Sequence, residues 1–179
     1  MSYDFHMIIV GPGEDAEAAV RRAVEREEAA EDEGPGSPVV SADDAERARR
    51  VVSALQRHAP ALEPFQLDHA KIARSLGVSE DEARRRFQHV ELNDDGAGAQ
   101  VSILGPTANV TVAYCHTGDK AEEVLTRVWG YLRVLQEEGG FAVFDNQLGR
   151  ALDLDKDFRD VLAAYLGVMK KMPRIIAAW

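Results

Sequence analysis

The sequence predicts an α+β fold in which a mostly antiparallel sheet is covered by helices on one face. Segments with alternating apolar and polar residues predict strands, and three of them between residues 89 and 114 predict an antiparallel meander. Residues 119–138 follow with apolar residues at alternating spacings of four and three, which predicts a helix that packs on the sheet. A length of 179 residues fits one domain, so we expect a single domain over residues 1–179.

The N-terminal part predicts one strand and two helices. Residues 3–10 alternate and then become continuously apolar, as in a strand that is buried on both faces at its end. A thin apolar stripe predicts a weakly packing helix over residues 14–30, and residues 31–38, with three acids, two glycines and two prolines, predict a mobile acidic loop. Ser41 begins a capping box for a second helix, which Pro60 ends. One side of this helix carries the apolar residues Ala45, Ala48, Val51, Val52 and Leu55.

The C-terminal part predicts strands, one long helix and a final helix. Gly139 and Gly140 end the long helix. The other predicted elements are a hairpin of residues 141–145 and 150–154 and a last helix over residues 155–172.

Composition excludes several classes of protein. Cys115 is the only cysteine, so an intrachain disulfide and a cysteine-ligated metal cluster are excluded. No apolar run approaches the roughly 18 residues that span a bilayer. The N-terminal sequence has no basic region before its short apolar stretch, which indicates a first strand instead of a signal peptide. We therefore expect a cytoplasmic protein without a membrane segment.

The formal charge of −10 is concentrated near the N-terminus. Residues 14–46 contain twelve acidic residues against three arginines, a net charge of −9. Such a surface attracts cationic partners and repels nucleic acid phosphates, although a solvated helix and loop that are polar for solubility are the favoured interpretation. The candidate contact residues of this acidic region are Glu27, Glu28, Glu31 and Glu33.

Residues 67–87 resemble a DNA-binding helix-turn-helix in the spacing of their apolar and turn residues. In that motif the residues after the turn enter the major groove, and here they are Glu80, Asp81 and Glu82. Carboxylates at this position oppose DNA, whereas they suit the first turn of an ordinary helix capped by Ser79. We therefore expect a plain helical hairpin and no nucleic acid partner.

Cys115 and His116 are adjacent, which suggests a nucleophile and a base. Neighbours in an extended strand point to opposite faces, so we expect that these two side chains do not contact each other. A structural cysteine at a strand end, with the following residues capping a helix, is the favoured interpretation.

His89, Glu91 and Asn93 share the polar face of one predicted strand, with Gln100 and Ser102 opposite them. This face could line a binding site, and His116 is a further candidate for it. Plain exposure to solvent is the alternative, because antiparallel sheets commonly leave one face to water. The pattern contains no glycine-rich phosphate loop, no metal-ligand spacing and no carboxylate pair that would define a reaction.

The C-terminal tail is basic and apolar. It either packs back onto the core or forms an association surface for a homo-oligomer. The residues concerned are Lys170, Lys171, Met172, Pro173, Arg174, Ile175, Ile176 and Trp179.

Residues 89–154 resemble a group of small uncharacterised bacterial α+β proteins. The resemblance rests on the segments His-Val-Glu-Leu-Asn-Asp, Trp-Gly-Tyr-Leu-Arg-Val-Leu and Phe-Asp-Asn-Gln-Leu-Gly-Arg-Ala-Leu-Asp-Leu. It covers a little over a third of the chain. It implies the α+β fold and a bacterial source, and it implies no activity and no site residues.

These observations favour a non-enzymatic binding protein with a protein partner, and an immunity or antitoxin protein is the most concrete version. We expect no catalytic residues, no cofactor and no metal. One alternative is a small-molecule-binding protein or hydrolytic enzyme with its site on the polar sheet face around His89, Glu91 and His116. Another is a helix-turn-helix-like regulator that uses residues 67–87.

Overall fold

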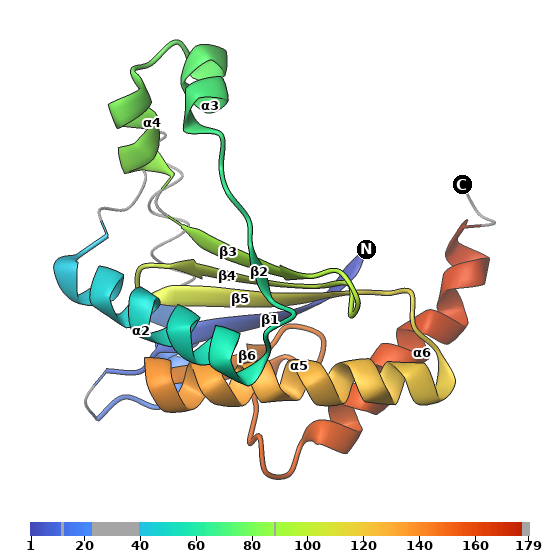
Figure 1. The fold of residues 1–179 in the computed structure, drawn as a ribbon. Helices are drawn as coiled ribbons and strands as arrows, with labels where there is room; N and C mark the ends of the chain where they lie inside the picture. Colours follow the sequence, from blue (N-terminus) through green and yellow to red (C-terminus); the bar gives the residue numbers. More distant parts are fainter. Residues whose placement is uncertain (12, 23–39, 88, 177–179) are drawn as a thin grey trace.

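The computed structural model describes residues 1–11, 13–22, 40–87 and 89–176. The seven strands in this part of the chain form one antiparallel sheet in the order β2-β3-β4-β5-β1-β6-β7 (Figure 1). They are β1 (Ser2–Ile9), β2 (Glu63–Pro64), β3 (Val90–Asp94), β4 (Ala99–Leu104), β5 (Thr107–Ala113), β6 (Phe141–Asp145) and β7 (Arg150–Ala151). The helices are α2 (Ala42–His58), α3 (His69–Leu76), α4 (Glu80–Arg86), α5 (Gly118–Gly139) and α6 (Phe158–Ile176).

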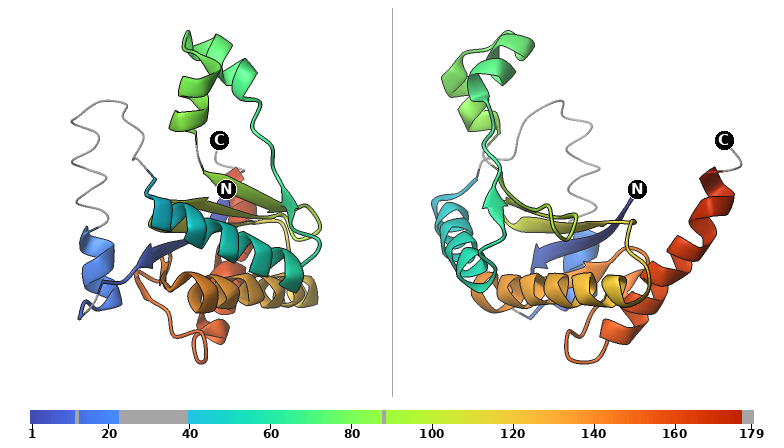
Figure 2. Two further views of the ribbon diagram at one scale, coloured as in Figure 1. Left: turned by 60° about the vertical axis from the view of Figure 1, so that its left-hand side comes forward. Right: turned by 45° about the vertical axis from the view of Figure 1, so that its right-hand side comes forward.

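The predicted α+β fold with helices on one face of the sheet is confirmed. Helices α2 and α5 lie on the same side of the sheet, and α6 packs against α5 (Figure 2). The predicted meander is β3-β4-β5, and β1 joins it by pairing with β5. On its other edge β1 pairs with β6, so the first strand lies in the middle of the sheet.

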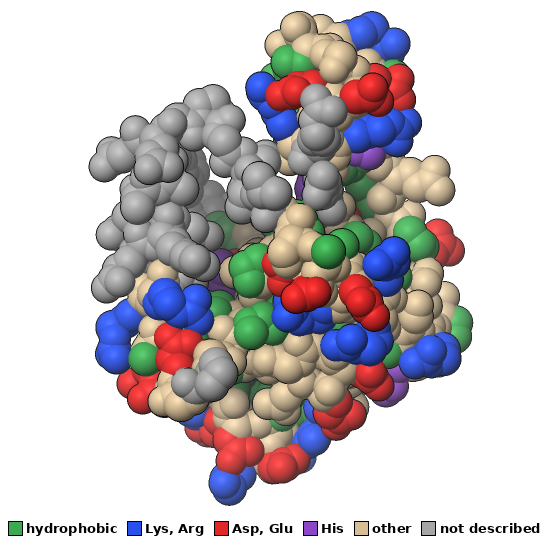
Figure 3. Space-filling model, turned by 90° about the vertical axis from the view of Figure 1, so that its left-hand side faces the viewer, with side chains coloured by type: hydrophobic (Ala, Val, Ile, Leu, Met, Phe, Trp, Pro, Cys, Tyr) green, Lys and Arg blue, Asp and Glu red, His purple; other side chains and the backbone are tan. Residues whose placement is uncertain are grey.

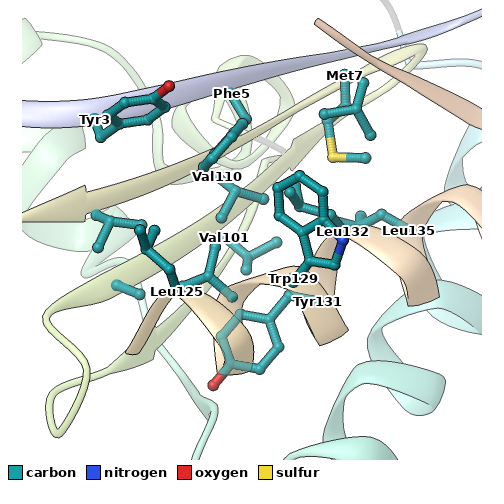
Figure 4. Close-up of a cluster of buried hydrophobic side chains, with 14 of the residues drawn as sticks. Tyr3, Phe5, Met7, Val101, Val110, Leu125, Trp129, Tyr131, Leu132 and Leu135 are labelled. Atoms are coloured by element: carbon teal, nitrogen blue, oxygen red, sulfur yellow. The ribbon is translucent and has the colours of Figure 1, made fainter. Parts of the chain in front are cut away.

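The core lies between the sheet and α5. Figure 4 shows side chains of α5 pointing toward the side chains of β1, β4 and β5. All of them are buried because alternate strand residues and one stripe of the helix face the same interior. The labelled residues are Tyr3, Phe5, Met7, Val101, Val110, Leu125, Trp129, Tyr131, Leu132 and Leu135.

Two buried carboxylates each stabilise the turn that follows a strand. Asp94 ends β3 and accepts hydrogen bonds from the Tyr131 hydroxyl at 2.6 Å and from the Ala97 amide at 3.1 Å. Asp145 ends β6 and accepts one at 2.5 Å from the Tyr3 hydroxyl. In each turn the fourth residue after the aspartate is a glycine with positive φ, 59° at Gly98 and 67° at Gly149, a conformation that other residues rarely adopt.

The second hairpin is shorter than predicted. We expected a strand over residues 150–154, whereas β7 contains only Arg150 and Ala151. The Leu154 carbonyl accepts hydrogen bonds from Trp129 Nε1 at 2.8 Å and Arg133 Nη2 at 2.9 Å, so this part of the chain binds α5 instead of the sheet.

Helix α6 also differs from the prediction at both ends, because it begins at Phe158 and continues to Ile176. Its last turns extend past the sheet in both views of Figure 2. Trp179 lies outside the described residues, and so does most of the predicted helix over residues 14–30, of which only residues 16–22 are described as helical. The predicted loop over residues 31–38 lies outside them as well.

Candidate functional site

Helices α3 and α4 form an arm that stands away from the sheet (Figures 1 and 2). Asp68 caps α3 by accepting a hydrogen bond from the Lys71 amide, and Gly77 ends the helix in the left-handed conformation. Ser79 then caps α4 by accepting from the Glu82 amide. The predicted helical hairpin with its Ser79 cap is therefore confirmed.

The arm is connected to the sheet at its foot. The Phe65 amide donates a hydrogen bond to the Glu91 carbonyl at 2.8 Å, next to the pairing of β2 with β3. The His69 Nε2 lies 3.3 Å from the Phe87 carbonyl. This contact joins the start of α3 to the residue that follows α4. Because a carbonyl oxygen only accepts, this imidazole nitrogen is the donor.

The apolar side of α2 is divided between two surroundings. Val51, Ala54 and Leu55 are buried toward the core, and of these Val51 and Leu55 were predicted on the apolar side of this helix. Ala45, Ala48 and Val52, which the sequence predicted on that same side, line a groove between α2 and the foot of the arm. A helix turns by 100° per residue, so the apolar stripe of α2 is wide enough to face both the core and this groove.

This hollow, which we call the arm groove, has a volume of about 730 Å³. Its walls come from α2, from the arm and from the ends of β3 and β4 nearest to it. Figure 3 shows this side of the molecule, with the arm above the body and with histidine and hydrophobic side chains where the two meet. The lining residues are Val40, Ala45, Ala48, Arg49, Val52, Ser53, His69, Arg84, Phe87, His89, Val90, Ile103 and Gly105.

His89 is the one predicted site residue that lines the arm groove among those described. Its Nε2 lies 3.9 Å from Glu91 Oε2, and Glu91 belongs to the polar sheet face, so His89 stands at the boundary of the two surfaces. The other groove residues were not predicted as a site. The sequence feature that could have indicated the groove is the apolar stripe of α2, which is wider than packing against the core alone requires.

The polar sheet face has the predicted register. Glu91 lies opposite Ser102, and Asn93 lies opposite Gln100. The Gln100 amide donates to Glu91 Oε1 at 2.7 Å and to Asn93 Oδ1 at 3.2 Å. Asn93 Nδ2 also donates to the same Glu91 oxygen at 3.3 Å. These side chains therefore satisfy one another, which leaves Glu91 poorly placed to serve as a free base.

The structure contradicts our expectation that Cys115 and His116 do not contact each other. The Cys115 Sγ lies 3.3 Å from His116 Nε2 because β5 ends at Ala113 and the chain turns at Tyr114 and Cys115, where neighbours need not point apart. The Cys115 side chain is exposed. Their backbone amides both lie 3.3 Å from the Tyr165 hydroxyl, which donates to the Ala113 carbonyl at 2.6 Å.

This contact does not form a nucleophile and base pair. His116 Nε2 lies 2.9 Å from the Ala97 carbonyl, which can only accept, so this nitrogen carries a proton and donates it. It cannot then remove a proton from the Cys115 thiol. His116 instead joins the end of β5 to the turn after β3.

His116 does not join His89 and Glu91 in one site. His89 precedes β3, whereas His116 contacts the turn beyond the last residue of β3. A strand of this length separates them by about 15 Å at ~3.3 Å per residue. The enzyme hypothesis on the sheet face therefore loses one of its three candidate residues.

The acidic candidates Glu27, Glu28, Glu31 and Glu33 lie outside the described residues. Within the described ranges, no group of three or more histidine, cysteine, aspartate or glutamate side chains is arranged to hold a metal ion. None of the described helices is both long enough and apolar enough to cross a membrane.

No protein family, curated protein or solved structure matched this chain in the comparisons.

Proposed function

We propose that this chain is a non-enzymatic binding protein and that a partner protein docks in the arm groove. The groove is the observation that supports this proposal. Its volume of about 730 Å³ falls within the range of sites that hold a ligand or the anchoring side chains of a partner. Its walls are mainly apolar, with a small number of polar groups at defined places, which is the usual composition of a binding site.

The reactive side chains of the described residues favour binding over catalysis. His116 donates to a backbone carbonyl, and Glu91 accepts from two amide side chains. Asp94 and Asp145 are buried and hold turns. A catalytic site requires a base and a nucleophile or acid that converge on one position, and each of these groups is occupied elsewhere.

Contacts within the arm support a protein partner more than DNA. Arg84 pairs with Glu80 at 2.6 Å and Arg86 pairs with Glu82 at 2.9 Å, so these two arginines are already neutralised within α4. A helix that reads DNA needs its cations free for phosphate and base edges. An immunity or antitoxin role depended on the acidic region and stays a prediction.

Photo-crosslinking in cells tests this proposal. The crosslinking amino acid p-benzoylphenylalanine replaces Ser53, an exposed groove residue of α2, and in a control chain it replaces Glu137, an exposed residue of α5 outside the groove. We expect a discrete protein adduct from position 53 that is absent from position 137. The same adducts from both positions, or none from position 53 or from Ala45, would contradict the proposal.

A further inference from the structure

From the charges around the arm groove we infer that the partner segment that enters it is acidic as well as apolar. This inference rests on the proposed function and names the chemistry of its partner. The chain as a whole has 31 acidic residues against 21 lysines and arginines. The described lining of the groove differs from this balance, because its charged residues are Arg49 and Arg84 and it contains no carboxylate.

Two carboxylates near the groove are already paired. Glu80 holds Arg84, and Asp44 pairs with Arg47. Glu91 accepts hydrogen bonds from neighbours on the sheet face. The charges of Glu80 and Asp44 are therefore compensated by arginines, which leaves Arg49 as the arginine of the described groove lining that has no carboxylate partner among the described residues.

Arg49 is the cation best placed to meet a partner carboxylate. It projects from the groove side of α2, is exposed, and forms no ion pair within the described part of the chain. An arginine fork matches a carboxylate with two parallel hydrogen bonds. Arg84 lines the groove from the arm but is already paired with Glu80 at 2.6 Å, so Arg49 is the cation that an incoming carboxylate would meet.

A protein segment fits this surface better than a free small molecule. The arm also exposes Phe65 and Leu76, each 51% accessible, and neither residue belongs to the groove lining. A small ligand in the groove would leave both of them in water. A partner that anchors apolar side chains in the groove can extend along the arm and cover them.

Selection from a random-peptide display library on the intact chain tests the inference. We expect the selected peptides to combine Leu, Ile or Phe with Asp or Glu. The variant Arg49→Gln should bind them about tenfold more weakly, since hydrogen bonds to a charged partner are lost. Arg57→Gln removes an exposed arginine of the same helix outside the groove and should bind them normally.

Ser53→Trp places a large side chain in the groove and should abolish binding, and Ala45→Trp provides a second filling variant with its fold checked by circular dichroism. Peptides that depend on an open groove but lack acidic residues, or that bind the Arg49→Gln variant normally, would overturn the inference and leave the proposed function standing. Failure to select any peptide that Ser53→Trp rejects would overturn both. Uptake of the apolar anion 1-anilinonaphthalene-8-sulfonate by the open groove in that case would identify a small ligand instead.

Discussion

The Tyr3 hydroxyl donates a 2.5 Å hydrogen bond to Asp145 Oδ2 and so joins the start of the chain to the turn after β6. The other oxygen, Asp145 Oδ1, accepts from the backbone amides of Gln147 and Leu148 at 2.8 and 2.9 Å. Asp145 is fully buried, and these donors are what make its burial tolerable. Burial, followed by the hydrogen bond to Asp145, raises the pKa of Tyr3, so its hydroxyl keeps its proton.

Replacing Tyr3 by phenylalanine should therefore destabilise the fold. The variant removes one donor from a buried carboxylate without removing the ring, and we expect a loss of about 2 kcal/mol in the free energy of unfolding. Urea denaturation measures this loss. Tyr114→Phe is the matched control because the Tyr114 hydroxyl makes no hydrogen bond with described residues, and it should change stability by less than about 0.5 kcal/mol. Equal effects of the two variants would contradict this account.

Asp94 should make stability depend on acid pH. Burial raises the pKa of this carboxyl, but hydrogen bonds from Tyr131, Arg127 and the Ala97 amide outweigh burial and hold it below its ordinary value. A pKa that is lower in the folded chain than in the unfolded chain, where it is about 3.9, stabilises the fold above that pH. The stabilisation is lost as the pH falls through the folded value.

The variant Asp94→Asn tests this relationship. It keeps the shape but removes the charge, and we expect a loss of about 2 kcal/mol in the free energy of unfolding at pH 7. Urea denaturation at several pH values should show this difference shrinking below pH ~4, as the wild-type carboxylate becomes protonated. A difference that stays constant down to pH ~2 would show that the charge of Asp94 does not stabilise the fold.

Two glycines of α5 should respond in opposite ways to substitution by alanine. A Cβ at Gly139 would overlap the ring of buried Phe141 and lie 3.1 Å from Val51 Cγ2, so Gly139→Ala should cost about 1–3 kcal/mol. A Cβ at Gly130 would lie 2.5 Å from His58 Nε2, but His58 is exposed and can turn away. Gly130→Ala should be neutral or stabilising by up to about 1 kcal/mol, because alanine favours helix. Thermal denaturation distinguishes them, and a reversed order would contradict this packing.

The arm should open more readily than the rest of the molecule. Helices α3 and α4 span 8 and 7 residues and pack mainly on each other, whereas α5 spans 22 residues over the core. Short helices with few buried contacts open at low free energy. Native-state hydrogen exchange should show amides of both arm helices exchanging at least about tenfold faster than those of α5. Equal protection would mean that the arm is held as firmly as the core.

Local patterns predicted most of the fold because each element buries its own stripe of apolar residues. The alternation in β1 and in the meander indicated strands with the observed faces, and Ser41 and Ser79 indicated helix starts that the structure confirms. Strand β7 was predicted too long because the Leu154 carbonyl binds Trp129 of another element. A contact between elements that are distant in the sequence can shorten a strand, and it leaves no periodic pattern of apolar residues in that strand from which the shortening could be predicted.

The candidate site was predicted only in part for the same reason. His89 was identified from its strand, but the groove that it lines combines α2, the arm and the end of β4. The contact between Cys115 and His116 was excluded by a rule for extended chain, and it exists because the chain turns after Ala113. The burial of Asp94 and Asp145 depends on tyrosines far away in the sequence, so no local pattern predicted it.

The most direct test of the binding proposal is the affinity of the partner recovered by crosslinking at position 53. Titration calorimetry would compare the wild-type chain with Ser53→Trp and with the control Glu137→Trp. The proposal predicts at least about tenfold weaker binding for Ser53→Trp, unchanged binding for Glu137→Trp, and the same melting temperature for all three chains. Equal affinity of the partner for Ser53→Trp and the wild-type chain would contradict the arm groove as its binding site.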